Sequence, residues 1–286
     1  MVKFNAVLMA VCSLGIALSG CQHRHADFRS LDEQFLEAAE NGDEKALRDL
    51  LKKGANVDAK EESGLSSLES SADRGDAKIV ALLLEMGAKG KNEALLQTVG
   101  GGPVVIIVES GAESGTPGAG RSPAKGMMGH EQTTKLLLDK GADIEARDPE
   151  GLTPLIKAAA YGRTGVAALL IERGAQIEAR DAGGGTALIE AACDCAVATM
   201  PDTFDVIQLL LEKGANINAR NNEGNTALMV ASNGGVVKTN IVKLLTENGA
   251  DVSIKNNRGE TALMIAKGSE VPDVVKILRS AGAKSH

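Results

Sequence analysis

The stretch Leu209-Leu210-Leu211-Glu212-Lys213-Gly214-Ala215-Asn216-Ile217-Asn218-Ala219-Arg220 recurs in close copies along most of this chain. Each copy contains a Gly-Ala pair that follows an aliphatic cluster. The glycines of these pairs are Gly54, Gly87, Gly111, Gly141, Gly174, Gly214, Gly249 and Gly282, at separations of 33, 24, 30, 33, 40, 35 and 33 residues. A unit that recurs at this spacing indicates a repeat protein, in which one small structural unit is stacked many times.

Each copy has the pattern of a helix that ends at its glycine. The position four residues before the glycine is aliphatic in all eight copies: Leu50, Leu83, Ile107, Leu137, Leu170, Leu210, Leu245 and Leu278. Further apolar residues precede it at steps of three and four, which is typical of one face of a helix. Glycine can then end the helix in a left-handed conformation, because it has no β-carbon to clash.

A second signal follows most of these pairs and predicts the start of another helix. It has the form Gly-x-Thr-Pro/Ala-Leu and occurs at residues 151–155, 224–228 and 259–263, and Gly185-Thr186-Ala187-Leu188 belongs to the same series. The threonine is suited to cap a helix, and Pro or Ala to its first position. Each unit therefore reads as a turn, a helix, a tight loop and a second helix.

This combination resembles the ankyrin repeat, over residues 31–284 and most specifically in the second half of the chain. The resemblance implies an all-α repeat solenoid of about seven or eight stacked helix-turn-helix units with short β-hairpin-like turns. One departure concerns the His that often follows Thr-Pro-Leu in the family. Ile156, Ile189, Met229 and Met264 stand at that position here, so the family's histidine hydrogen bonds are not expected.

Residues 90–130 break the period. Gly87 and Gly111 are too close for a complete unit, and residues 114–123 are rich in Gly and Pro. The segment is either two eroded repeats or one repeat with a long inserted loop. We favour two eroded repeats, because residues 105–112 copy the helix-end pattern closely.

The first thirty residues differ in kind from the rest. Lys3 precedes an apolar run from Phe4 to Leu18, which has the order of an export signal. The following Leu18-Ser19-Gly20-Cys21 resembles the lipobox of bacterial lipoproteins. That resemblance implies a signal peptide at residues 1–20, a lipid on Cys21, a tether at 21–30 and attachment on the periplasmic side of the bacterial envelope. Gln22 after the cysteine implies the outer membrane.

Composition narrows the class of partner. The chain of 286 residues has a formal net charge of −7, with 43% hydrophobic and 2% aromatic residues. An acidic surface with few aromatic residues disfavours nucleic acid, whose phosphates attract basic proteins. It favours another protein, with a basic surface, as the partner.

Few residues suggest chemistry. Cys193 and Cys195 could be structural or free thiols, which we favour, or a redox pair or soft-metal ligands. The histidines are only His23, His25, His130 and His286, and no metal-ligand or catalytic spacing is present. We therefore expect no enzyme activity, no cofactor and no metal.

The resemblance instead implies a protein-binding surface at the turn tips and inner helices. The predicted binding residues are Asp148, Glu150, Asp181, Asn221, Asn222, Glu223, Asn256, Asn257 and Arg258. Asp and Asn are also favoured in such turns for backbone reasons. The sequence thus predicts a membrane-anchored scaffold for protein–protein interaction, such as an inhibitor or immunity protein. The alternatives are a redox- or metal-responsive protein that uses Cys193 and Cys195, and a structural spacer.

Overall fold

The computed structural model describes residues 29–100, 125–193, 203–233 and 238–283, with the backbone alone at 125–128. The chain divides into two units, residues 1–30 and 31–286, and the described helices all lie in the second. These helices are α1 (Leu31–Glu40), α2 (Glu44–Lys52), α3 (Ser67–Asp73), α4 (Ala77–Glu85), α5 (Lys91–Gly100), α6 (Lys125–Asp139), α7 (Pro154–Ala160), α8 (Thr164–Glu172), α9 (Ala187–Ala192), α10 (Phe204–Glu212), α11 (Ala227–Ser232), α12 (Lys238–Glu247), α13 (Ala262–Gly268) and α14 (Pro272–Ser280).

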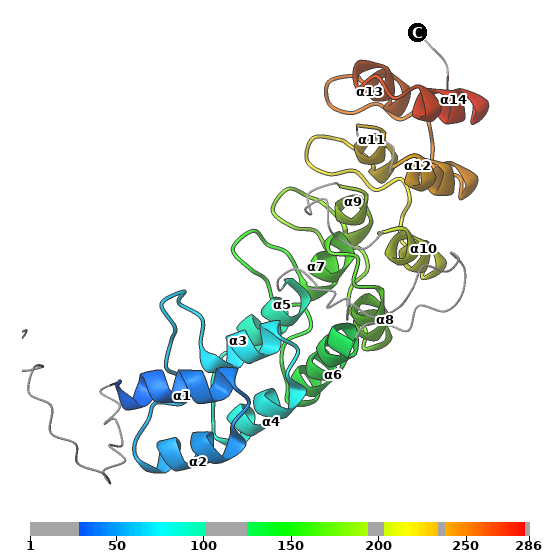
Figure 1. The fold of residues 1–286 in the computed structure, drawn as a ribbon. Helices are drawn as coiled ribbons and strands as arrows, with labels where there is room; N and C mark the ends of the chain where they lie inside the picture. The colour runs from blue at the N-terminus through cyan, green and yellow to red at the C-terminus, as the bar shows by residue number, and fades with distance from the viewer. Residues whose placement is uncertain (1–28, 101–124, 194–202, 234–237, 284–286) are drawn as a thin grey trace, which may run out of the picture. The chain divides into compact units, whose positions relative to one another are not determined.

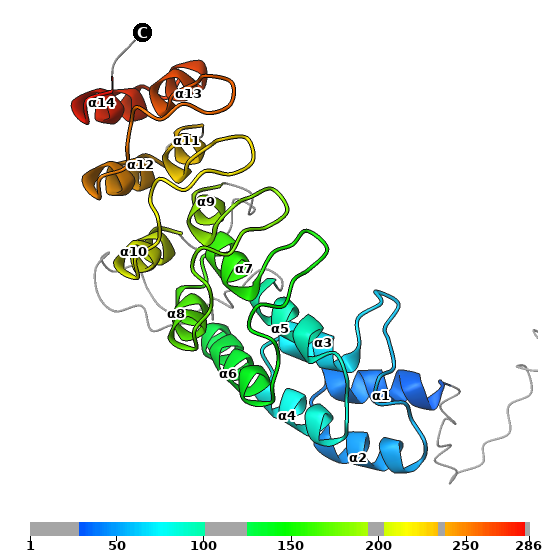
Figure 2. The same cartoon turned by 180° about the vertical axis from the view of Figure 1, so that it is seen from behind.

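The helices form pairs, and the pairs are stacked in chain order (Figure 1, Figure 2). Each odd-numbered helix packs against the even-numbered helix that follows it. The odd-numbered helices also pack on one another in sequence, and from α4 onward so do the even-numbered ones. The described part of the second unit therefore contains seven helix pairs in two layers, and this confirms the predicted all-α repeat stack.

The predicted helix ends at glycine are confirmed in every copy that the structure describes. At Gly214, φ is +86°. The Gly214 N–H donates to the Leu211 carbonyl at 3.0 Å, and the Ala215 N–H donates to the Leu210 carbonyl at 2.9 Å. This pair of bonds is the Schellman motif, which satisfies carbonyls that the helix leaves without partners. The same two bonds occur at Gly54, Gly87, Gly141, Gly174, Gly249 and Gly282, whereas Gly111 lies outside the described residues.

The predicted threonine caps are confirmed at three of four helices. Thr153, Thr226 and Thr261 each accept a hydrogen bond from the backbone N–H three residues later, at the start of α7, α11 and α13. Thr186 has the same extended backbone before α9 but makes no side-chain cap bond. All four threonines therefore have the extended backbone that precedes a helix, and three of them also cap the helix with a side-chain hydrogen bond.

The core consists mainly of aliphatic and alanine side chains between neighbouring pairs. One buried cluster runs from Phe35 to Ala142 and a second includes Val99 and residues from Leu155 to Leu278. Leu138 packs against both clusters. The aliphatic residue four before each described glycine is buried in all seven copies.

The residues that replace the family's histidine belong mostly to this core. Ile156, Ile189 and Met229 are no more than 2% exposed, whereas Met264 is 38% exposed. Three of the four therefore pack in the apolar core, at the position where the family often has a histidine.

The packing around residues 90–130 differs from the two eroded repeats that the sequence favoured. Helix α5 packs against α3 and α7, and α6 packs against α4 and α8, while α5 and α6 contact each other. They occupy the two layers as one pair. The arrangement is therefore that of one repeat with a segment inserted between its helices. The motif at 105–112, on which the other interpretation relied, lies outside the described residues.

Replacing a helix-ending glycine should destabilise the stack through the backbone alone. Gly214 is left-handed, and a β-carbon there would have no heavy atom within 4 Å. We expect Gly214→Ala to lower the free energy of unfolding by about 1–2 kcal/mol, since a left-handed residue with a β-carbon is strained. Urea unfolding followed by circular dichroism measures this.

Gly268→Ala is the matched control. Gly268 lies at the end of α13 without a positive φ, and a β-carbon there also meets nothing within 4 Å. We expect no loss of stability, because alanine favours a helix over glycine by about 1 kcal/mol. Equal losses for the two variants would contradict the role given to the left-handed turn.

Candidate functional site

Hairpin loops project beyond the layer of odd-numbered helices, one before each of α3, α7, α9, α11 and α13 in the chain (Figure 1). Four of them follow one another without interruption, at residues 147–153, 180–186, 220–226 and 255–261, and we call these four the loop row. The second residue of each range is called the first tip residue; these residues are Asp148, Asp181, Asn221 and Asn256. Each donates its N–H to the carbonyl four residues later, at distances from 3.2 Å at Asp148 to 2.9 Å at Asn256. This geometry confirms the expected β-hairpin-like turns.

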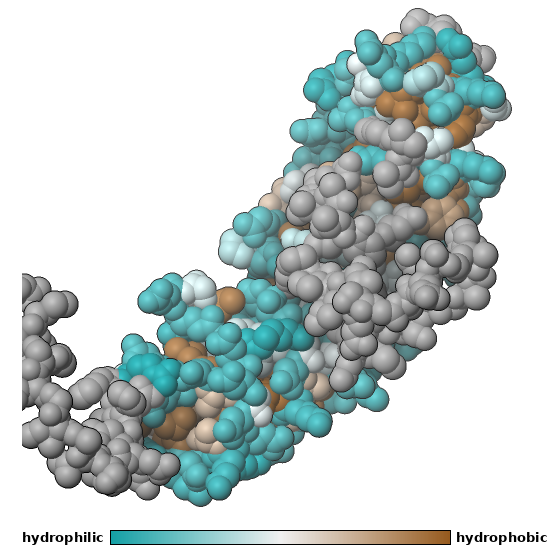
Figure 3. Space-filling view, in the orientation of Figure 1, coloured by the Kyte–Doolittle hydropathy of each residue, from teal (hydrophilic) through white to brown (hydrophobic). Residues whose placement is uncertain are grey.

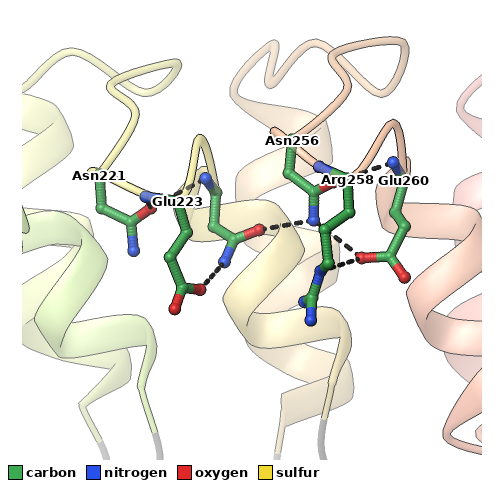
Figure 4. A network of polar contacts seen from close by, with 6 residues as sticks. Asn221, Glu223, Asn256, Arg258 and Glu260 are labelled. Atoms are coloured by element: carbon green, nitrogen blue, oxygen red, sulfur yellow. Dashed lines mark hydrogen bonds and ion pairs between the residues drawn. The ribbon is translucent and has the colours of Figure 1, made fainter.

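The first tip residue of each loop also uses its side chain to hold the turn. Asp148 Oδ1 accepts from the Leu152 N–H at 2.8 Å, and Asp181 Oδ1 accepts from the Gly185 N–H at 2.7 Å. Asn221 and Asn256 each accept from two backbone N–H groups of their own loops, two and four residues later (Figure 4). Short polar side chains of this kind stabilise turns by replacing backbone hydrogen bonds.

Asn256 is the most buried of these residues, with 5% of its surface exposed. Its Nδ2 donates to Asn225 Oδ1 of the preceding loop at 2.9 Å and to Glu260 Oε2 at 3.0 Å. Glu260 in turn pairs with Arg258 Nε at 2.9 Å (Figure 4). The last loop is thus fixed both within itself and to its neighbour.

Backbone hydrogen bonds connect consecutive loops of the loop row. The N–H of Ala182 donates to the Glu150 carbonyl at 3.1 Å, that of Asn222 to Gly183 at 2.9 Å, and that of Asn257 to Glu223 at 2.9 Å. The Asn222 and Asn257 side chains each donate one further bond to a carbonyl of the preceding loop. Both residues, predicted as binding residues, therefore also join repeats together.

Arginines beneath the tips provide links that the sequence did not lead us to expect. Arg147 Nη1 donates to the Gly151 carbonyl at 2.7 Å and to the Arg180 carbonyl at 2.6 Å. Arg180 makes the corresponding bonds to Gly184 and Arg220, and Arg220 does so to Gly224 and Lys255. The available signal was the arginine that precedes the tip residue in three consecutive loops.

The remaining predicted residues lie on the exposed part of the tips. Glu223 accepts a bond from Asn225 Nδ2 at 2.9 Å. Glu150 is exposed, and within the described part of the chain its carboxylate has no partner. The nine predicted residues thus lie together along the loop row, but most of their polar atoms hold the loops in place. In Figure 3 this edge is mainly hydrophilic.

Among the described residues, two grooves lie between loops and odd-numbered helices. One, of about 560 Å³, has Val230, Met264 and Ile265 among its lining residues, with the Arg258–Glu260 pair beside them. The other, of about 890 Å³, is lined by residues of α3, α5 and α7 and the segment 143–150. The second groove contains a largely buried ion pair between Lys157 Nζ and Asp148 Oδ2, at 3.1 Å.

A carboxylate of the next repeat has an altered pKa. Burial raises the pKa of Glu190, and the nearby charge of Asp181 raises it further. Both effects disfavour the ionised form. The polarity of the inner side of the stack therefore changes along the chain. It is charged at the Lys157 ion pair, less so at Glu190, and apolar at Val230 of α11 and Ile265 of α13.

The prediction for the cysteines is resolved in part. Cys193 is disulfide-bonded, so it is not the free thiol that the sequence favoured. Its partner sulfur lies outside the described residues, as do Cys21 and Cys195. Among the described residues, no three His, Cys, Asp or Glu side chains are grouped to hold a metal ion. None of the described helices is long and apolar enough to cross a bilayer.

Comparison with known protein families agrees with this geometry. The family model for ankyrin repeats (3 copies) matches residues 124–221 and 195–286. These two matches together cover more than half of the chain. No curated protein matches the chain.

Tip residues that hold the loops should be separable from tip residues that only face solvent. We expect Asn256→Ala to lower the free energy of unfolding by about 2–3 kcal/mol, because it leaves buried polar groups without partners. Glu150→Ala should change it by less than about 0.5 kcal/mol, as for other exposed positions. Urea unfolding of both variants tests this, and a neutral Asn256→Ala would refute the structural role of the asparagine.

Proposed function

Because this chain belongs to the ankyrin repeat family, we propose that it is a scaffold that binds another protein along the loop row and the odd-numbered helices beneath it. Ankyrin repeat proteins are usually non-enzymatic binding scaffolds. The single observation that carries the proposal is the chain of hydrogen bonds from loop to loop, which holds an exposed edge in one arrangement. A surface that is already ordered loses little conformational entropy when a partner binds.

Charge supports a basic partner. The formal net charge is −7, and Glu150 and Glu223 face solvent at the tips of two loops. Complementary charge accelerates encounter and disfavours wrong partners. The same charge disfavours nucleic acid as a ligand.

We further propose that the scaffold is anchored by a lipid on Cys21 to the bacterial envelope, on the periplasmic side of the outer membrane. The support is in the sequence: Lys3, the apolar run to Leu18 and the Leu-Ser-Gly-Cys motif. A binding scaffold held there is suited to act as an inhibitor or immunity protein against an enzyme of the envelope.

One alternative function is favoured by a specific observation. Cys193 is disulfide-bonded, as a redox-responsive element would require, and it lies within the longest interval between the glycines, from Gly174 to Gly214. Titration of thiols with and without reductant, together with metal analysis, separates this alternative from simple binding. A structural spacer, the remaining alternative, would retain no partner protein at all.

Reversing the charge of the tips should abolish partner binding. We expect the double variant Glu150→Lys and Glu223→Lys to lose any protein that the wild type retains from solubilised bacterial envelopes, because a basic partner would be repelled. The matched control is Glu85→Lys with Glu172→Lys, two exposed residues on the even-numbered helices α4 and α8. Retention of nothing by the wild type, or equal retention by all three proteins, would contradict the proposed binding surface.

Removing the lipid attachment site should release the protein from membranes. We expect Cys21→Ala to move the protein from the membrane fraction to the soluble fraction and to remove the mass of the lipid from its mature N-terminus. Cys12→Ala is the control and should remain anchored, because Cys12 lies within the apolar run. A Cys21→Ala protein that still carries lipid would rule out this anchor.

A further inference from the structure

The third helix pair lacks a hairpin loop. Only residues 86–90 separate α4 from α5, whereas residues 213–226 separate α10 from α11. In Figure 1 no loop projects in front of α5, between the loops that precede α3 and α7. The groove of about 890 Å³ lies there, since its lining includes Glu69 of α3, Glu93 of α5 and Glu150 of the first loop in the loop row.

The sequence beside this gap is adapted to the missing loop. In the other three loops of the row, the second tip residue donates its N–H to the preceding loop. The first loop has Pro149 at that position, and proline has no N–H to donate. Proline in this place blunts the exposed edge against addition of another strand. The groove is therefore suited to a side chain rather than to a partner strand.

The charges that line the groove indicate which kind of side chain it can bind. Among the described residues, six carboxylates and two basic residues line it; the acids are Glu69, Glu93, Asp143, Glu145, Asp148 and Glu150. Both basic residues are already engaged, Lys157 with Asp148 and Arg147 with the carbonyls of Gly151 and Arg180. The groove thus carries an excess of negative charge that no described cation neutralises.

The partners of these acids identify the two that are available. Glu69 accepts from the Ser66 N–H, Glu145 from the Gln176 N–H, and Asp143 from the Glu145 N–H. Glu93 and Glu150 are exposed, and neither carboxylate has a partner within the described residues. They come from two different walls, one from α5 and one from a loop.

The groove also accommodates the stem of a long basic side chain. Leu96 and Ala146, each 7% exposed, contribute to its lining together with Pro149. Lysine and arginine pack their methylene groups on such apolar surface while their charged ends reach polar groups. The internal ammonium of Lys157, paired with Asp148 in the same groove, shows that a cation is stable in this environment.

We propose that this groove, formed where the third repeat lacks its hairpin loop, binds a lysine or arginine side chain on a turn of the partner protein, between Glu93 and Glu150. The proposal rests on the proposed binding function and specifies the chemistry of the partner. The partner's turn takes the place of the absent loop, and its basic side chain supplies the charge that the groove lacks.

The test uses a phage library of cyclic heptapeptides selected on the full chain, because such peptides present turns. We expect the selected peptides to contain lysine or arginine at one preferred position. Their Kd should rise at least about tenfold for the double variant Glu93→Gln and Glu150→Gln, which removes both carboxylates of the pair. The control Glu85→Gln with Glu172→Gln, on the outer helices, should keep Kd within about twofold.

A second variant fills the groove. Residues 176–186, one complete hairpin segment of the chain, replace Lys89 and Gly90 before α5. We expect this variant to retain its helical circular dichroism and to lose the selected peptides. Peptides without a basic residue, no enriched peptide, or binding unchanged in both variants would each overturn the proposal. The proposed function is decided separately, by retention of envelope protein with Glu150→Lys and Glu223→Lys.

Discussion

Each helix pair of this chain has apolar side chains that only its neighbours can cover. Leu210 and Leu245 illustrate the requirement, because each is fully buried and lies on an outer helix whose pair packs on the next. Burial of a leucine contributes roughly 1.5–3 kcal/mol, and in a stack that contribution is available only where a neighbour is present. The close approach of the pairs in turn requires each helix to end sharply, and a left-handed glycine provides that end.

The hairpin loops add a polar counterpart to this apolar stack. Their tips use asparagine, aspartate and arginine to saturate the backbone, and the bonds cross from one repeat to the next. Saturation matters because an unpaired polar group in a packed turn is costly. As a result the side chains that do not hold the loops, among them Glu150, stand on a fixed edge. The gap before α5 interrupts that edge with an acidic groove at one defined place.

Much of the fold could be predicted from the sequence because it is decided locally. The glycine after each described aliphatic cluster and the threonines before α7, α11 and α13 define helix ends through hydrogen bonds within a few residues. The pairing at residues 90–130 could not be predicted in this way, because residues 105–112 have the same local sequence pattern as the helix end at Gly141. Packing across repeats, of α5 on α3 and of α6 on α4, shows that α5 and α6 form one pair. Similarly, Asn222 and Asn257 resemble binding residues in sequence, and their bonds to the preceding loop appear only once repeats are placed side by side.

The central claim is that neighbouring pairs alone stabilise one another. Hydrogen exchange of the intact protein with Leu278→Ala, which removes a fully buried side chain of α14, tests it most directly. We expect amide protection to fall in α13 and α14, to fall less in α11 and α12, and to be unchanged in α3 and α4. A uniform loss of protection across all helices would contradict it, because it would mean that one shared core holds the molecule together.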